Sequence, residues 1–218
     1  AQRLSNNGFH VWMPDFYGTG DSEGDFAEID FELWLKDLSS ILISCNFQNI
    51  SFISCRFGVQ LLSAFLKEHH NFNVERIVLW QPQWDIALFW KKQWRLSVVS
   101  AINNESKTSI PALQQLELSG FVDIQGYQIP FGFYQYTSAL NENLSGFSRC
   151  PILWIECQAS ELLSQSVSAR LNVLQHSSCH NVDLVTLPVS AFWLTQEPLD
   201  IEPLVDITVR FFEDSRHG

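Results

Sequence analysis

The chain has 218 residues, of which 46% are hydrophobic and 17% charged, a composition typical of a folded globular protein. Its 24 acidic residues outnumber the 13 lysines and arginines and give a formal net charge of -11, so a phosphate backbone would be repelled and nucleic-acid binding is not expected. No apolar run approaches the ~18 residues that a membrane span needs.

The cysteines indicate a reducing environment. There are five of them, an odd number without a C-x-x-C pair: Cys45, Cys55, Cys150, Cys157 and Cys179. A chain of this size does not need disulfides, so the pattern favours buried thiols in a cytoplasmic protein. Because no pair of carboxylates flanks a histidine, neither a metal nor a cofactor is expected.

The N-terminal part predicts a helix end, a strand, a loop and a second helix. Residues 1–8 read as the tail of a helix capped at Gly8, with further sequence expected before it. Residues 8–14 are rich in β-formers and end at a proline, which predicts a strand, and a loop rich in glycine and acid follows. From Asp30, a plausible N-cap, apolar residues recur at helical spacing as far as Cys45.

The rest of the chain alternates short apolar runs with amphipathic ones, except in the middle. Strands are predicted at 49–54, 76–80, 151–157 and 182–187, and helices from 59, at 161–175 and at 199–212. Residues 83–146 are rich in Trp, Phe and Tyr and are predicted to form an insertion of helices and loops. The alternation predicts one domain, 1–218, with a mainly parallel sheet covered by helices on both faces.

The segment ISCRFG at residues 53–58 stands where a strand turns into a helix. Compared with the nucleophile-elbow pattern G-x-S-x-G, Ser54 and Gly58 take the glycine places and Arg56 takes the nucleophile's place. Upstream, residues 15–24 read D-x-x-G-x-G-x-S-x-G after a predicted strand. The order of loop, helix, strand, elbow and lid insertion resembles the α/β-hydrolase superfamily.

Several short segments narrow the resemblance. PDFYGTGDSEGDF, SCRFGVQLL, LWQPQWD, LELSGF and AFWLTQE are similar to the exosortase A system-associated hydrolase 2 family. The resemblance implies an α/β-hydrolase fold with a helical lid at about 83–146 and with its N-terminal strands missing before Ala1. It also implies a link to exopolysaccharide biosynthesis or export.

A hydrolytic triad needs a nucleophile, an acid and a histidine at the carboxyl edge of the sheet. A guanidinium cannot act as a nucleophile, the loop 158–164 holds only Glu161 as an acid, and the loop 188–197 holds no histidine. None of the six histidines is expected to serve as a general base: His10, His69, His70, His176, His180 and His217. Cys55 and Cys157 are alternative nucleophiles, although burial is the favoured interpretation for both. The sequence thus predicts a hydrolase-like pseudoenzyme.

Arg56 requires its own explanation, because a cation at a helix N-terminus lies at the unfavourable end of the helix dipole. It needs a carboxylate or an anionic ligand nearby. The candidate carboxylates are Glu197, Asp85, Glu161 and Asp21. Arg56 either forms an ion pair that ties loops together or, with the amides of Phe57 and Gly58, forms an anion site.

The predicted ligand-binding residues are Arg56, Phe57, Gly58, Glu197, Asp85 and Trp84. The aromatic residues of the insertion either form its core or line an apolar or sugar-stacking pocket. The favoured function is binding of an anionic or acyl-bearing small molecule without catalysis. Two alternatives stay open: an esterase or thioesterase-like hydrolase with an atypical site, and a scaffold whose aromatic lid docks a partner protein or a second copy.

Overall fold

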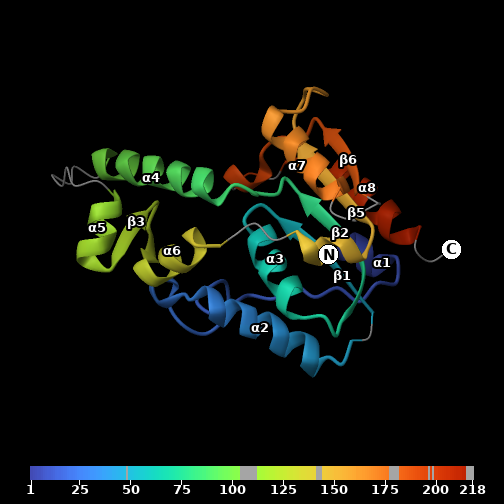
Figure 1. The fold of residues 1–218 in the computed structure, drawn as a ribbon, viewed down its shortest axis with the longest axis horizontal. Helices are drawn as coiled ribbons and strands as arrows, with labels where there is room; N and C mark the ends of the chain where they lie inside the picture. Colours follow the sequence, from blue (N-terminus) through green and yellow to red (C-terminus); the bar gives the residue numbers. More distant parts are fainter. Residues whose placement is uncertain are drawn as a thin grey trace. The chain divides into compact units, whose positions relative to one another are not determined.

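The computed structural model describes residues 1–47, 49–103, 112–140, 144–176, 182–195, 197 and 199–214 (Figure 1). These form two compact units. The first comprises Ala1–Met13, Phe47–Pro82 and Asn143–Gly218, and the second Pro14–Asn46 and Gln83–Glu142. Expectations for Cys179, His180, His217 and parts of the insertion (104–111 and 141–143) fall outside the described residues. The expectation of a single domain with a lid stays a prediction.

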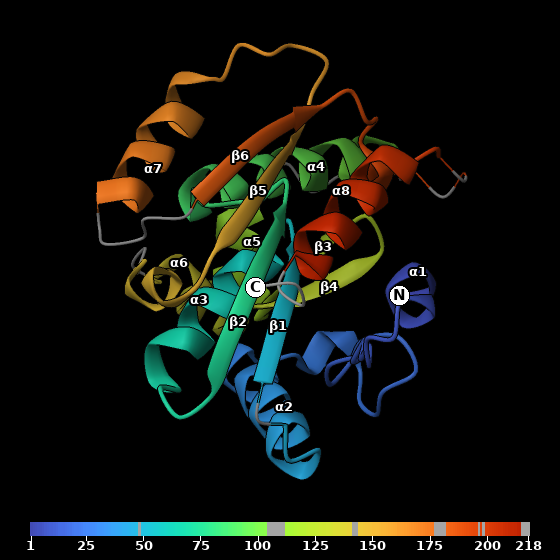
Figure 2. The same ribbon diagram turned by 90° about the vertical axis from the view of Figure 1, so that its right-hand side faces the viewer.

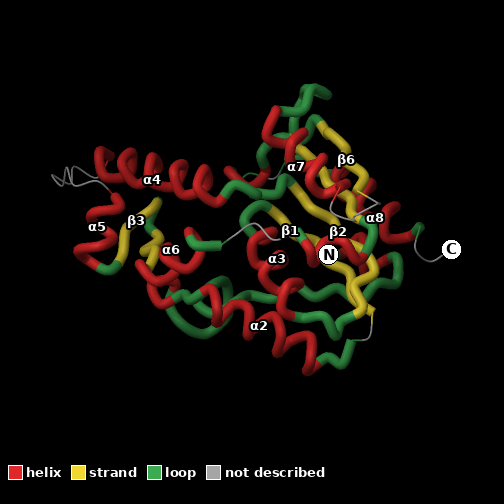
Figure 3. Tube along the Cα trace, in the orientation of Figure 1, coloured by secondary structure: helices red, strands yellow, loops and turns green. Residues whose placement is uncertain are grey.

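The first unit is built on a parallel sheet with strand order β1-β2-β5-β6 (Figure 3). The strands are β1 (Asn49–Cys55), β2 (Asn73–Trp80), β5 (Ile152–Cys157) and β6 (Val182–Leu187). In β5 five consecutive residues are buried, as a strand covered on both faces requires. The predicted parallel sheet is therefore confirmed.

Helices cover the two faces of this sheet (Figure 2). One face carries α3 (Gly58–Glu68) and α7 (Gln165–His176), and the other carries α1 (Gln2–Asn6) and α8 (Glu202–Glu213). Short 3-10 turns, η2 (Ser145–Arg149) and η3 (Phe192–Leu194), complete the unit. The core on the α8 side is formed by buried apolar side chains of α1, the sheet and α8, among them Leu4, Val78, Leu153, Ile155 and Leu204. Each such side chain contributes roughly 1.5–3 kcal/mol.

The predicted helix end at Gly8 is present. Gly8 has a φ of 78°, its amide donates to the carbonyl of Ser5 at 2.9 Å, and the amide of Phe9 donates to that of Leu4 at 3.1 Å. This is the Schellman arrangement, which favours glycine because of its left-handed conformation.

The second unit contains η1 (Phe26–Glu28), α2 (Phe31–Ser44), α4 (Ile86–Asn103), α5 (Ala112–Ser119) and α6 (Phe131–Ser138). A two-stranded antiparallel hairpin, β3 (Phe121–Ile124) and β4 (Tyr127–Pro130), belongs to it as well. Asp30 caps α2, as expected: its side chain accepts a hydrogen bond from the amide of Glu32 at 2.7 Å.

Three expectations about elements were wrong. Residues 9–14 form no strand, because a strand needs a paired neighbour and no described strand pairs with this segment. The hairpin was missed, although its turn residues Gln125 and Gly126 both have positive φ, 55° and 88°, as a type I′ turn requires. Helices α7 and α8 begin at Gln165 and Glu202, three or four residues after their predicted starts.

Candidate functional site at the β1–α3 corner

Arg56 occupies a strained corner. It directly follows β1 and has a φ of 54°, a left-handed conformation that costs a non-glycine residue about 1–2 kcal/mol. Its amide donates to the carbonyl of Trp80 at 3.0 Å, and α3 begins two residues later at Gly58. The geometry of a nucleophile elbow is thus present, with an arginine at its apex. Strain of this kind is a common mark of functional sites.

The two positions flanking Arg56 need small residues. Ser54 is buried, and a Cβ placed on Gly58 would lie 3.2 Å from the Ser54 hydroxyl oxygen. Such a contact is tighter than side chains normally tolerate, so strand and helix can approach this closely only with a small residue at each place. This explains the spacing of Ser54 and Gly58 that the sequence shows.

The guanidinium of Arg56 is held by two neighbours. Nη1 donates to the carbonyl oxygen of Gln81 at 3.3 Å. The guanidinium carbon lies 4.7 Å from the ring centroid of Trp193, within the range of a cation–π contact. Burial lowers the pKa of Arg56, while the nearby acidic groups, Cys55 and Glu156 first among them, oppose that shift.

A buried carboxylate, Glu156, lies in the same network. It is 3% exposed, and its two oxygens accept hydrogen bonds from Trp154 Nε1 at 2.7 Å and Gln81 Nε2 at 2.6 Å. Burial raises the pKa of Glu156, and both hydrogen bonds and the charge of Arg56 act against that rise. A buried charge needs such partners. The charge of Glu156 acts on Arg56, and the four rim acids suggested by the sequence stay predictions.

Gln81 links the ends of two strands. It has a φ of 44°, its amide donates to the carbonyl of Ile155 at 2.8 Å, and its side-chain oxygen accepts from the amide of Cys157 at 2.5 Å. Sequence reasoning missed both Gln81 and Glu156. The available signal was a single carboxylate inside the otherwise apolar strand ILWIEC, because such a residue is rarely buried without partners.

The other predicted site residues are distributed over both units. Phe57 and Gly58 form the start of α3, with Glu197 exposed elsewhere in the first unit. Asp85 and Trp84 belong to the second unit, where Asp85 accepts a hydrogen bond from the amide of Leu88 at 2.7 Å. Their participation in one site with Arg56 stays a prediction.

The two thiols near the corner are poor nucleophiles. Burial raises the pKa of Cys55 to about 11 and that of Cys157 to about 11. The thiolate is the reactive form, so at neutral pH both are held as thiols. Both residues are half-buried, so the full burial favoured from sequence is not reached.

Two histidines have local structural contacts. His69 stacks on Phe65 with ring centroids 4.3 Å apart, and Nδ1 of His176 lies 2.6 Å from the carbonyl of Asn172. They stand at the C-terminal ends of α3 and α7. In a parallel αβ layer these ends lie at the edge opposite the elbow, so neither residue is placed to serve Arg56.

The aromatic residues of the insertion pack mainly among themselves. Trp90 is 4% exposed, stacks on Trp94 at 5.1 Å and meets Tyr134 edge-on at the same distance. A second aromatic group joins Phe31 to Tyr136 at 5.2 Å. These contacts indicate that the aromatic residues form a core, which is one of the two interpretations that the sequence left open.

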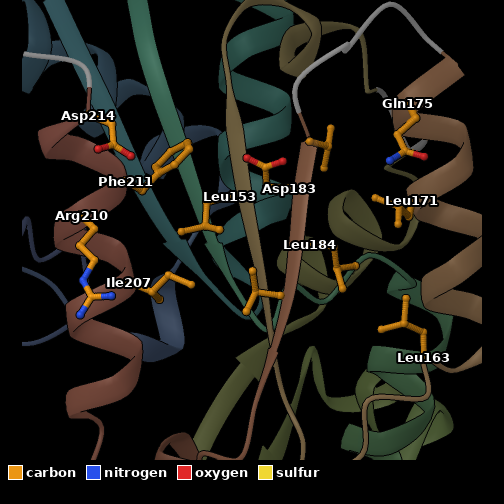
Figure 4. A pocket seen from close by; sticks show the side chains of 12 residues that line it. Leu153, Leu163, Leu171, Gln175, Asp183, Leu184, Ile207, Arg210, Phe211 and Asp214 are labelled. Carbon is orange, nitrogen blue, oxygen red and sulfur yellow. The ribbon is translucent and has the colours of Figure 1, made fainter. Parts of the chain in front are cut away.

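A cavity of about 620 Å³ lies elsewhere in the first unit, beside β6 and between α7 and α8 (Figure 4). Leu171, Leu184 and Phe211 are among its lining residues, and none of the predicted site residues is. Among the described residues, no group of His, Cys, Asp and Glu could hold a metal. No described helix has the length and apolar character needed to cross a membrane.

Comparisons with known proteins identify the fold. No family model and no curated protein matches the sequence. Among solved structures, VinJ aligns with a TM-score of 0.60 at 13% identity, over 97% of this chain and 83% of its own. A carboxylesterase structure from Nitrososphaera gargenis gives 0.56 at 16%, over 91% and 78%.

Two further structures agree. Mouse alpha/beta hydrolase domain-containing protein 10 gives a TM-score of 0.54 at 17% identity, over 93% of this chain and 76% of its own. A hydrolase-like structure from Agrobacterium vitis S4 gives 0.53 at 15%, and the chain spans 65% of its length, slightly less than two thirds. Together with the parallel sheet flanked by helices, these similarities show that the chain has the α/β-hydrolase fold.

Proposed function

We propose that this chain is a non-catalytic member of the α/β-hydrolase fold that binds an anionic or acyl-bearing small molecule at Arg56. The observation that carries the proposal is Arg56 itself, at the strained apex of the elbow. In an active hydrolase this apex presents the attacking group to a carbonyl carbon. Here it presents a cation, and the neighbouring thiol of Cys55 has a pKa raised to about 11.

The chemistry of the corner favours an anion. A guanidinium has five N–H donors in a planar fork that matches a carboxylate or a phosphate, and it stands beside the start of the eleven-residue helix α3. Glu156 makes its hydrogen bonds to Trp154 and Gln81. Its charge favours the ionised form of Arg56, while both of its oxygens accept from these two donors.

The biological setting is proposed from the sequence resemblance. Similarity of residues 54–62 and of the loops to the exosortase-associated family supports a role in exopolysaccharide biosynthesis or export, in the cytoplasm. Trp193, which stacks on Arg56, supplies an apolar surface against which an acyl chain or a sugar ring can lie.

Thermal shift titrations test the proposal with phosphate, acetate and hexanoate as probes. We expect the native chain to gain stability with at least one of these anions, and Arg56→Gln to lose that gain. Lys67→Gln, which removes an exposed cation from the same helix, is the matched control and should retain it. If Arg56 serves only to tie loops together, Arg56→Gln lowers the melting temperature while the anion response persists, and the proposal is wrong.

The hydrolase alternative has a separate readout. Turnover of short-chain p-nitrophenyl esters that disappears on a single substitution at Cys55 or Cys157 would identify a catalytic thiol. That result would replace a binding function with a catalytic one.

A further inference from the structure

Helix α4 carries a row of basic residues on its exposed side. Lys91, Lys92 and Arg95, here called the basic stripe, are all exposed. Their spacing of three and four residues places them on one helical face. Trp90 and Ser97, on the other side of the helix, are buried. Figure 1 shows α5, β3 and α6 of the same unit all on one side of α4. The buried Trp90 meets Tyr134 of α6 edge-on, so the exposed stripe lies on the other side of the helix.

The stripe is a locally positive region on a strongly acidic chain. It holds three of the 13 basic residues of a protein with net charge -11, and no acidic residue occurs from 86 to 103. The nearest acid along the chain, Asp85, accepts a hydrogen bond from the amide of Leu88 at the start of the helix. Both ion pairs recorded among the described residues involve Arg3.

Two apolar side chains border the stripe. Leu88 is 42% exposed and Val98 50% exposed, one turn before and one turn after the cations on the same face. From Leu88 to Val98 the helix rises about 15 Å, the length of two to three turns of a partner helix. The surface thus combines a positive centre with apolar ends.

We propose that the outer face of α4, from Leu88 to Val98, is a docking surface for an acidic protein that presents carboxylates along a helix. Complementary charge of this kind steers association and fixes register. This proposal does not depend on the proposed ligand of Arg56.

An anionic membrane fits these observations less well than a compact protein. A bilayer would attract the stripe by about 1 kcal/mol per basic residue, but as an extended plane it would also face the excess negative charge of the chain. The apolar side of α4 is already packed, so only Leu88 and Val98 remain to insert. A small acidic partner contacts the stripe alone, and charges more than about 8 Å away are largely screened at physiological salt.

The test uses a labelled helical peptide with glutamates at positions i, i+4 and i+7, and a matched peptide with glutamines at those places. Fluorescence anisotropy measures binding to the whole chain at low and physiological salt. We expect the glutamate peptide to bind and the combined change Lys91→Gln, Lys92→Gln, Arg95→Gln to weaken binding about tenfold, a loss consistent with three exposed ion pairs. The control, Lys36→Gln, Lys67→Gln, Arg210→Gln, changes the net charge equally at other exposed positions and should bind normally.

Four outcomes overturn the proposal. Equal binding of both peptides, or equal weakening by both triple variants, shows that the stripe is not specific. Sedimentation of the chain with phosphatidylserine vesicles but no binding of the glutamate peptide assigns the face to a membrane. Concentration-dependent self-association that only the stripe variant abolishes, again without peptide binding, assigns the face to a second copy.

Discussion

At the scale of single residues, the corner is organised around the buried carboxylate of Glu156 and the half-buried guanidinium of Arg56. Glu156 and Arg56 each have a pKa shifted by burial toward the neutral form and by each other toward the charged form. Removing either group therefore takes from the other a charge that favours its ionised form. The network therefore makes the two residues interdependent.

Glu156→Gln should destabilise the protein although the two side chains have nearly the same shape. Both carboxylate oxygens accept from N–H donors, Trp154 Nε1 and Gln81 Nε2. In the glutamine variant, the side-chain NH₂ group must face one of these two donors, where the wild-type chain has an accepting oxygen. Leaving a buried donor unsatisfied costs about 1–3 kcal/mol. Urea denaturation measures the loss, and Glu75→Gln, an exposed position on β2, should change stability little. Equal stability of Glu156→Gln and the native chain would contradict the described hydrogen bonds.

The pH dependence of stability should also reflect the burial of Glu156. Because the pKa of Glu156 is raised in the folded state, the folded chain binds its proton more tightly than the unfolded chain. The stabilisation from Glu156 is therefore fully present below the unfolded pKa of about 4.3 and is lost as pH rises through the folded pKa. The stability of the native chain minus that of Glu156→Gln should fall over this range. A difference that rises with pH would show that the pKa is lowered instead.

The thiols give a second residue-level prediction. With pKa values of about 11, Cys55 and Cys157 are thiolates to about one part in a thousand at pH 8, and iodoacetamide should label them slowly. Mass spectrometry of the labelled peptides follows the rate against pH, with free cysteine as the reference. A labelling midpoint near pH 7 for either residue would make that residue a candidate nucleophile again.

Only part of this chemistry was accessible from the sequence. Arg56 was found because the residues at 54 and 58 fix a known corner geometry. Glu156 was not, because its partners come from two strands: Gln81 follows β2 and Trp154 lies on β5. Such a meeting depends on strand register, which local patterns do not specify.

At the scale of elements, the cap of α2 is the most direct test of a local signal. Asp30→Ala removes the side chain that accepts from the amide of Glu32 and should cost about 0.5–2 kcal/mol. Asp30→Asn keeps an acceptor at the same place and should retain most of the stability. Chemical denaturation of the three chains gives the comparison, and an alanine variant as stable as the native chain would show that the cap contributes nothing.

Element prediction succeeded where periodicity and caps agreed and failed where an element depends on a neighbour. The helix from Phe31 was correctly placed because it has a clear apolar period, and the strand Val182–Leu187 because it is a short, mainly apolar and β-branched run. Residues 8–14 have β-forming composition, but strand formation needs pairing, and composition does not supply a partner. The residues of the hairpin Phe121–Pro130 alternate between apolar and polar, which is a signal of strands. The abundance of aromatic residues in the insertion kept this signal from being recognised.

At the scale of the whole molecule, the sequence predicted the α/β-hydrolase fold and the structure confirms it. Parallel strands with helical crossovers permit few topologies, so alternation alone restricts the fold strongly. The ligand is a different matter, because one fold hosts many functions and only the site distinguishes them. Six solved structures that align with TM-scores above 0.5 share 12–17% of their residues with the chain, so they give the architecture and not the activity.

The basic face of α4 also belongs to this scale. The total charge of -11 led to the expectation that nucleic acid is not bound, which stays a prediction. It could not show that three scattered-looking cations share one exposed helical face, because that depends on where α4 begins and on which side it packs.

The side chain of Gln81 has one further consequence. Its oxygen faces a backbone N–H and its nitrogen faces the carboxylate of Glu156, so both ends of the amide are committed. A single-nucleotide change from a glutamine to a glutamate codon, or slow deamidation of ageing protein, would place a second carboxylate beside the first. One of the two carboxyl groups would then have to retain a proton at neutral pH. A glutamate at position 81 would therefore make the stability of the corner depend on pH in a new way.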